Sequence, residues 1–571
     1  MTRLKEHLKK HLYLYILFGL TTILCILPLS IFNFPGGHDY TFHMDRISNI
    51  SQNISNGHWF APIYYGQLEG YGYASPLFYG DILLHIPGVL VTFGLTVEEA
   101  FRFFIILCFS STVFVTYFCA TSIFKNGLAA FVSTIIYAFS SYFCIDILTR
   151  VAIGEVQAFI FCPLVILGFF SIIYENGEKK LFLPLGLTGL IISHTLTAVA
   201  VVVILVLVSL FYIGVFIKSP KKLIWLGEMA CLFFALSAFF VFPMIEQMMS
   251  GTFRATDGTT DVIWGTLADR ALPLWALVND FNYMVDTYYW IPNGIGISYF
   301  VALAFSIYMF IKERGHDERP YFYLIISTLV LLIMSDIFPW NLLQGICGSM
   351  QFPWRLMIFA ILFLSISSGF IVCGIKNVST KRLFAFLIVL FSLFSFGMTA
   401  SPKIERMIQN KINHVVFTPN WHNALGAAEY LPSGSDWDEM LRRGDEVKSN
   451  VLEIADTASI TRRFDELEIS FENNTSGEAY LELPLVMYKG YTAVLEDGTQ
   501  LELSCVKGYM RADISNIKSG TFVAKYTGTT VQLVSKIISI TAIISILAWI
   551  AIKNGGKFIK SKRQKQNVQN A

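Results

Sequence analysis

The chain has 571 residues, of which 54% are hydrophobic and only 15% are charged. Its mean hydropathy of +0.56 is too high for a soluble globular protein and indicates several membrane spans. The formal net charge of +1 shows no basic surplus, so we expect no nucleic acid among the partners. These numbers indicate a multi-span membrane protein. In such a protein the positions of the few charged residues point to function.

Hydrophobic runs predict the helices, because a helix that crosses a membrane needs roughly 20 apolar residues. About twelve such runs are present, and they predict an all-α polytopic membrane bundle. The runs are 13–33, 101–124, 127–146, 157–174, 180–194, 196–217, 222–245, 296–312, 320–337, 353–375, 382–400 and 534–552.

Basic residues in the short loops predict the orientation, because cytoplasmic loops carry an excess of Lys and Arg. If the N-terminus is cytoplasmic, all the basic clusters of the short loops also lie on the cytoplasmic side. These clusters begin at Lys125, Lys179, Lys218, Lys312 and Lys376. We therefore expect both termini in the cytoplasm and extensive contact with membrane lipids.

This topology divides the chain into three parts. Residues 1–400 form the membrane core, with a long first outer loop at 34–100. Within that loop the run 76–95 is nearly apolar enough to cross, but a crossing would turn the later basic clusters outward, so we place it in the outer interface or a protein-lined cavity. Residues 401–533 are polar with short alternating runs and predict a small β-rich domain outside the membrane. Residues 534–571 form the last span and a basic cytoplasmic tail.

The densest group of ionisable side chains beside a predicted span lies at the start of the first outer loop. In a helix, Asp39, His43 and Arg46 would stand at positions i, i+4 and i+7 on one face, whereas Asp45 would point elsewhere. The alternative is that Asp39 caps the helix and Arg46 pairs with Asp45 or a lipid phosphate. We favour a functional site, because three such groups on one face exceed what a cap requires.

Three further places on the predicted outer side carry ionisable residues. Arg150 and Glu155 lie between two spans, where a salt bridge and a functional role explain the spacing equally well. His194 lies at a tight helical turn, where a single histidine is usually a satisfied polar residue or an interface anchor. Trp354 and Arg355 open an outward-starting helix, and this arginine is placed to hold a lipid-linked phosphate or to reach ordinary lipid head groups.

These residues belong to short motifs spread over nearly the whole chain. The motifs are Gly37-His38-Asp39 with Phe42-His43 and Arg46, Gly72-Tyr73 before Ser75-Pro76-Leu77-Phe78-Tyr79, Arg150 with Gly154-Glu155, Ser193-His194-Thr195, Phe352-Pro353-Trp354-Arg355, Glu429-Tyr430-Leu431-Pro432, and Leu483-Pro484 before Asp497-Gly498. Together they resemble the bacterial YfhO-like membrane proteins, some of which are labelled 6-pyruvoyl-tetrahydropterin synthase-related. That group is similar to the GT-C class of membrane glycosyltransferases.

The resemblance implies a reaction and a location. An enzyme of this class in the bacterial plasma membrane would move a sugar from a polyprenyl-phosphate donor to a cell-envelope acceptor, such as teichoic acid, polysaccharide or protein, on the outer face. Asp39 would be the general base and Arg355 would balance the charge of the leaving phosphate. The residues that would shape the pocket or bind the substrates are His43, Arg46, Arg150, Glu155, His194 and Trp354.

We expect no cofactor. Many members of the GT-C class have paired acids or a metal-binding set in the first outer loop, whereas His38-Asp39 is not a carboxylate pair, so a divalent metal is not favoured. The nine cysteines show no C-x-x-C spacing and are interpreted as small apolar side chains.

Two other functions fit parts of the pattern. A transporter or flippase for a lipid-linked or polar envelope precursor would also have many spans and outer ionisable residues. Such proteins carry charges or helix breaks at mid-membrane. Mid-span charges are scarce in this chain, and Glu228 is the clearest one. A membrane-anchored binding protein, in which the outer β domain does the work, leaves the many preceding spans unexplained.

Overall fold

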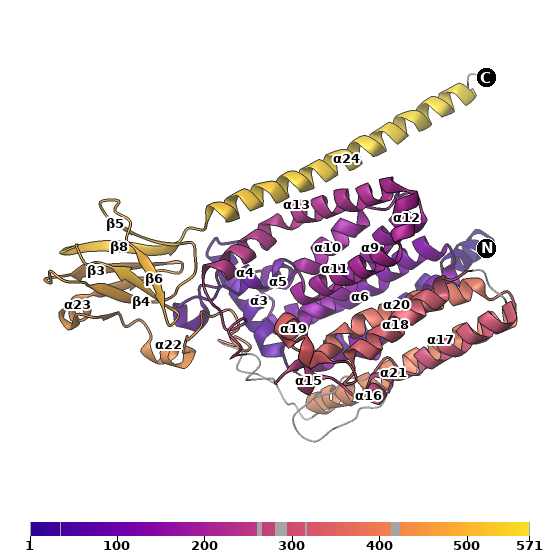
Figure 1. Ribbon diagram of the computed structural model, residues 1–571, viewed down its shortest axis with the longest axis horizontal. Coiled ribbons are helices and arrows are strands. Elements are labelled where there is room, and N and C mark those ends of the chain that lie inside the picture. The colour runs from indigo at the N-terminus through magenta and orange to yellow at the C-terminus, as the bar shows by residue number, and fades with distance from the viewer. Residues whose placement is uncertain are drawn as a thin grey trace.

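The computed structural model describes residues 2–34, 36–259, 265–279, 294–313, 317–412 and 423–569. A helical part occupies most of the molecule, and a β-rich domain lies at one end of it (Figure 1). Both chain termini lie at the opposite end (Figure 1). Residues 413–422, which belong to the predicted β-rich part, lie outside the described residues.

Each predicted hydrophobic run coincides with helical structure. The corresponding helices are α1 (Thr2–Thr21) continued by η1 (Thr22–Ile26) and α2 (Leu27–Ile31), α6 (Val97–Phe124), α7 (Gly127–Ala138), α8 (Ser141–Ile145), α9 (Ile153–Tyr174), α10 (Phe182–Ile191), α11 (Thr195–Phe211), α12 (Ile213–Lys218), α13 (Pro220–Ser250), α17 (Ile297–Tyr308), α18 (Arg319–Met334), α20 (Met357–Gly374), α21 (Val378–Ile412) and α24 (Thr530–Gln569).

Seven helices in the described part of the chain are long and apolar enough to cross a membrane, or eight if the bent pair Gly127–Ala138 and Ser141–Arg150 forms one span. Four predicted runs form shorter helices, namely α10, α11, α17 and α18, with 10, 17, 12 and 16 residues. A multi-pass membrane protein follows from these helices. The expected number of about twelve crossings, and the cytoplasmic termini, stay predictions.

The first long connection is folded rather than extended. It contains α3 (Tyr40–Ser55), α4 (Ser75–Phe78) and α5 (His85–Thr92), which lie between the helical part and the β-rich domain (Figure 1). The apolar run 76–95 is therefore broken into short pieces. Helix α5 packs on α3 so closely that a Cβ atom at Gly88 would overlap with Ile50.

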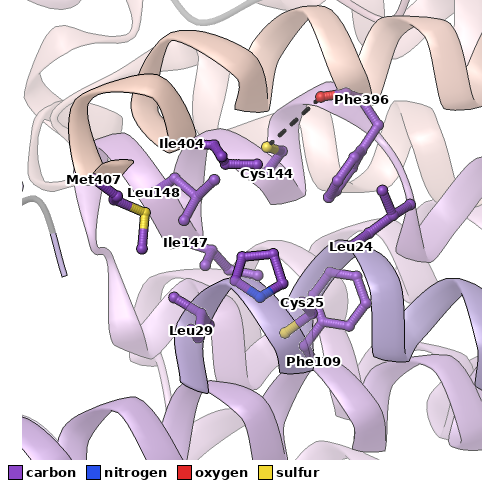
Figure 2. A pocket seen from close by; sticks show the side chains of 11 residues that line it. Leu24, Cys25, Leu29, Phe109, Cys144, Ile147, Leu148, Phe396, Ile404 and Met407 are labelled. Atoms are coloured by element: carbon purple, nitrogen blue, oxygen red, sulfur yellow. Dashed lines mark hydrogen bonds between the residues drawn. The ribbon is translucent and has the colours of Figure 1, made fainter. Parts of the chain in front are cut away.

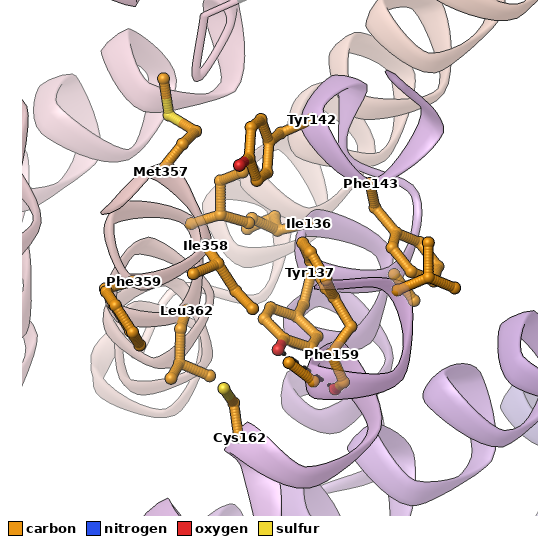
Figure 3. Packing of buried hydrophobic residues seen from close by; sticks show 14 of the residues in the cluster. Ile136, Tyr137, Tyr142, Phe143, Phe159, Cys162, Met357, Ile358, Phe359 and Leu362 are labelled. Atoms are coloured by element: carbon orange, nitrogen blue, oxygen red, sulfur yellow. Dashed lines mark hydrogen bonds between the residues drawn. The ribbon is translucent and has the colours of Figure 1, made fainter. Parts of the chain in front are cut away.

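Helix α20 lies at the centre of the helical part. Its residues are apolar on every face and almost all are buried, as expected of a helix surrounded by other helices. Figure 3 shows Ile358 of this helix beside Tyr137 and Leu362 beside Cys162. Phe143 and Phe159 belong to the same hydrophobic cluster, with ring centroids 4.4 Å apart. Helix α20 packs mainly on α18 and α7, and α7 leads directly into α8 and α9.

A small cavity of about 20 Å³ lies where α2, α6, α8 and α21 meet (Figure 2). Its lining is apolar and includes Cys25, Cys144 and Met407. The Cys144 thiol donates a hydrogen bond to the Phe396 carbonyl at 4.0 Å. The space accepts about one water-sized group and offers few polar partners, so we interpret it as a packing gap.

The predicted β-rich domain is present and consists of two packed four-stranded antiparallel sheets. The first sheet has the order β1-β4-β7-β6 and the second has the order β2-β3-β8-β5. The elements are α22 (Trp437–Arg443), β1 (Lys448–Ser449), α23 (Leu452–Thr457), β2 (Ser459–Arg462), β3 (Glu466–Glu472), β4 (Tyr480–Val486), β5 (Tyr491–Leu495), β6 (Leu503–Val506), β7 (Tyr509–Asp513) and β8 (Ser519–Tyr526).

The boundary between the two parts differs from the expected position. Helix α21 continues to Ile412, past the expected end of the core at residue 400, because a helix can carry polar residues beyond the hydrocarbon layer. Moreover, the first long connection contributes Tyr71, Tyr73 and Phe78 to the hydrophobic core of the β domain. The β domain and the first long connection thus form one packed unit.

Close packing of α9 on α10 depends on two glycines. A Cβ atom at Gly168 would overlap with the backbone nitrogen of Leu183, and one at Gly186 would lie 2.7 Å from the backbone nitrogen of Val165. Backbone atoms cannot move aside as the end of a flexible side chain can. The two helices therefore need glycine at both positions.

We predict that Gly168→Ala lowers the free energy of unfolding by about 1–3 kcal/mol, because the added methyl group overpacks the α9–α10 contact. The matched control is Gly227→Ala in α13, where nothing lies within 4 Å of the new atom and the better helix propensity of alanine should be neutral to stabilising. Thermal unfolding of both purified variants in the same detergent checks this. Equal melting temperatures would contradict the proposed contact.

Candidate active site

A large cavity of about 1450 Å³ lies between the helical part and the β domain. Its walls come from the start of α3, the turn between α8 and α9, the start of α11, the end of α13, and the segments 269–275, 349–355 and 423–437. Seven of the eight predicted site residues line it, namely Asp39, His43, Arg150, Glu155, His194, Trp354 and Arg355.

Asp39 is held in place by its backbone. Its N–H donates to the Arg150 carbonyl at 2.9 Å, and the N–H of His38 donates to the Thr149 carbonyl at 3.2 Å. The two chain segments approach so closely that a Cβ atom at Gly37 would overlap with Val151. The backbone of Asp39 is thus hydrogen-bonded to that of Arg150, a residue more than 100 positions away in the sequence.

The side chain of Asp39 makes no helix-capping hydrogen bond, although it stands at the N-cap position of α3. This disfavours the alternative in which the carboxylate serves only as a cap. Protein surrounds the group except on the cavity side, and this burial raises the pKa of Asp39 above its usual range. The charges of Arg150 and Arg355 oppose that rise in the pKa but do not cancel it.

His43 and Arg46 separate, although helical spacing predicts a shared face. His43 lines the cavity, and burial keeps the pKa of its imidazole well below the usual value, so the ring is neutral. Arg46 is not among the described lining residues: the carbonyls of Tyr79 and Gly80 cover it and each accept a hydrogen bond from Nη2 at 3.0 Å. The prediction that Arg46 faces the ligand is therefore corrected, since a segment more than 30 residues away occupies its part of the helix face.

Asp45 points away from the cavity, as predicted. Its carboxylate accepts hydrogen bonds from the side chains of Asn49 and Gln67. Arg46 is buried and its guanidinium lies over the Tyr79 ring at 4.4 Å, so it neither pairs with Asp45 nor reaches lipid phosphate. Both residues contribute to the shape of the first long connection.

Glu155 lies between two arginines. Arg150 donates to both of its oxygens, at 2.8 and 3.0 Å, and Nε of Arg355 lies 3.1 Å from Oε1. Arg150 also pairs with Asp146, at 2.5 Å. The predicted salt bridge is present, and its members also face the cavity, so the two interpretations of this pair are compatible.

Arg355 and Trp354 complete this wall. The Trp354 ring lies 4.4 Å from the centre of the Arg150 guanidinium, in a cation–π contact. Arg355 donates to the Met350 carbonyl at 3.1 Å and passes by the Phe352 ring at 5.4 Å. These contacts hold the guanidinium at the cavity surface, where an anionic ligand can reach it.

His194 combines a structural role with a position on the cavity. It caps α11, because its Nδ1 accepts a hydrogen bond from the Thr197 backbone N–H at 3.4 Å. Its ring makes an edge contact with Tyr79 at 6.2 Å. The capping hydrogen bond agrees with the expectation of a satisfied polar residue. The position on the cavity wall is compatible with a functional role as well.

Several lining residues were not predicted as site residues. Glu429 and Tyr430 belong to the motif Glu429-Tyr430-Leu431-Pro432, but nothing in its sequence indicated a role at the site. Trp437 and Arg270 lie in segments without a recognised motif. Burial raises the pKa of Glu429, and the nearby charge of Asp39 adds to the rise. Sequence spacing cannot reveal such residues, because their place at the site depends on long-range folding.

Across the described residues, no group of three His, Cys, Asp or Glu side chains is arranged to hold a metal ion. Metal independence of the reaction stays a prediction.

Comparisons with known proteins give a limited set of relatives. No family model matches the chain. An uncharacterised protein of Lactococcus lactis subsp. cremoris (strain MG1363) is 25% identical over 351 residues, which cover 59% of this chain and 56% of that protein. The chain thus spans little more than half the length of this curated relative.

Two solved structures show weak likeness. The apo oligosaccharyltransferase of Archaeoglobus fulgidus is 14% identical, with 69% of this chain and 56% of that one covered and a TM-score of 0.40. ArnT of Cupriavidus metallidurans, bound to undecaprenyl phosphate, is 9% identical, with 76% and 88% covered and a TM-score of 0.41. Scores this low assign no function to the chain.

We predict that Asp39→Asn raises the melting temperature at neutral and alkaline pH. The raised pKa of Asp39 means that the native state binds its proton more tightly than the unfolded state, so stability falls as pH rises through the raised pKa. Asparagine does not ionise, so the variant does not lose this stability as the pH rises. Melting curves of both proteins from pH 4 to pH 8 should show a gap that widens as the pH rises, whereas Asp438→Asn on the exposed surface of α22 should show none.

Proposed function

We propose that the chain is a membrane glycosyltransferase that moves a sugar from a polyprenyl-phosphate donor to a cell-envelope acceptor on the outer face. The observation that carries this proposal is one cavity in which the half-buried carboxylate of Asp39 shares the walls with Arg150 and Arg355. Glycosyl transfer from a phosphate needs a base and a cation, and the cavity offers both.

Asp39 is suited to act as the general base. Its carboxylate would accept the proton of an acceptor hydroxyl while that oxygen attacks the anomeric carbon of the donor sugar. The bond between this carbon and the phosphate oxygen breaks, and both its electrons leave with the phosphate. A carboxylate with a raised pKa is a stronger base than an ordinary aspartate, provided that it is ionised when the acceptor binds.

Arg355 is suited to receive the leaving phosphate. The negative charge on the phosphate grows as the bond breaks, and a fixed guanidinium stabilises it without having to reorient. Glu155 and the Met350 carbonyl fix this guanidinium beforehand. Neutral His43 is positioned as a hydrogen-bonding partner for one of the substrates.

The distribution of charge supports an enzyme rather than a transporter. Glu228, the clearest mid-span acid in the sequence, forms an ion pair with Lys180 and is half exposed. The buried Arg150 and Glu155 instead line the cavity beside the β domain, and the buried Asp146 pairs with Arg150 behind them. A transporter would need binding groups that two sides of the membrane can reach in turn.

We predict that Asp39→Asn lowers the rate of sugar transfer at least about 100-fold, because the acceptor hydroxyl loses its base. The measurement is transfer of radiolabelled sugar from polyprenyl-phosphate-linked donors in membranes that contain equal amounts of each variant. Asp45→Asn, beside the cavity but pointing away, is the matched control. Transfer at the wild-type rate by the Asp39 variant would refute its role as base.

We predict that Arg355→Ala lowers kcat/KM for the donor by about 10- to 100-fold, the range expected for loss of a hydrogen bond to a charged group. Undecaprenyl phosphate as a competing ligand should lose inhibitory power to a similar degree. Arg355→Lys should recover part of the effect, since it restores the charge without the planar fork. An unchanged response to donor concentration would contradict phosphate binding by Arg355.

A further inference from the structure

We propose that Glu429, Tyr430 and Trp437 form an acceptor subsite for a neutral, hydroxyl-rich glycan on the β-domain side of the cavity. All three side chains line the same cavity as Asp39, although they lie some 400 residues later in the chain. This inference rests on the proposed glycosyltransferase function and adds the chemical class of the acceptor.

The segment that carries Glu429 is tied to three parts of the molecule. The Glu429 carbonyl accepts a hydrogen bond from the Ala255 N–H, just after α13, at 2.8 Å. The hydroxyl of Tyr73 accepts from the Tyr430 N–H, and the hydroxyl of Tyr488 donates to the Tyr430 carbonyl, both at 3.1 Å. Glu429 therefore stands on a rigid support rather than on a free loop.

The backbone beside Glu429 adopts a conformation that is costly for its residue type. Ala428 has a φ of +55° and is fully buried, and few residues other than glycine and asparagine adopt such a φ. The surrounding contacts hold this turn in place, and the turn directs Glu429 into the cavity. The position of this carboxylate is thus maintained at a conformational cost.

Aromatic rings flank the carboxylate. Tyr430 stacks on Phe78 with centroids 5.1 Å apart, and Trp437 stacks against the Arg254 guanidinium at 4.7 Å. Phe42, three residues after Asp39, lies close to the carboxylate, since a Cβ atom at Gly426 would contact both the Phe42 ring and the Glu429 carboxylate. Flat apolar rings beside a hydrogen-bond acceptor suit the apolar faces and the hydroxyls of a sugar ring.

The charges of this wall decide the class of acceptor. Glu429 and Asp39 line the same cavity, and the negative charge of Asp39 adds to the rise in the pKa of Glu429 that burial causes. Arg355 is the cation that opposes both, but Glu155 and the proposed donor phosphate occupy it. A phosphate or carboxylate on the acceptor would meet two carboxylates here, whereas hydroxyl groups can donate hydrogen bonds to them.

The test is binding of glycans without any transfer reaction. Purified full-length protein in detergent is applied to an array of neutral and phosphate-bearing envelope oligosaccharides, including glycerol phosphate oligomers, and the best neutral glycan is then titrated in solution. We expect the neutral glycans to bind better than the phosphate-bearing ones. We expect Glu429→Gln to weaken the neutral glycan about 10- to 100-fold, as loss of a charge-assisted hydrogen bond predicts.

Two further variants separate binding from folding. Trp437→Leu removes a stacking surface at the rim without touching the carboxylate and should also weaken binding, whereas Glu453→Gln removes an exposed charge of the same domain and should not. Preference for phosphate-bearing glycans, no binding of neutral ones, or wild-type binding by both site variants would overturn the subsite. If the subsite binds as expected but the membranes transfer no sugar, the proposed function fails and the subsite stands.

Discussion

Ionised side chains beside a membrane are stable only when each is paired, and Glu155 meets this requirement for two arginines at once. Removing Glu155 would leave two buried or half-buried cations without their shared partner. The ion pairs with Arg150 and Arg355 join the turn after α8 to the start of α20. Since Arg150 also accepts the backbone hydrogen bond from Asp39, the same network places the proposed base.

The cavity is assembled from segments that are remote in sequence, and each contributes what the others lack. The start of α3 supplies the carboxylate of Asp39, the turn after α8 and the segment before α20 supply the arginines, and segment 423–437 supplies Glu429, Tyr430 and Trp437. The proposed base, the proposed phosphate-binding guanidinium and the proposed acceptor subsite thus lie on different segments. If these roles hold, the acceptor subsite can change without loss of the groups proposed to act on the donor.

The sequence predicted the helices and the β domain well, because the length of an apolar run and the alternation of strands are local signals. Seven of the eight site residues that it predicted line the cavity, since ionisable groups such as Asp39 and Arg355 stand out beside apolar runs. It placed Arg46 wrongly, because nothing local shows that the carbonyls of Tyr79 and Gly80 cover its helix face. Glu429 was missed for the same reason: its part in the cavity depends on contacts with remote segments.

The β domain is inserted between two long helices, because α21 precedes it and α24 leaves it. Its hydrophobic core also contains Tyr71 and Tyr73 from the first long connection. A single protease cut within this domain would therefore release neither fragment: one stays attached through α21, the other through α24, and the shared core still joins them. The nicked protein would migrate as two bands on a denaturing gel yet elute from a sizing column as one particle.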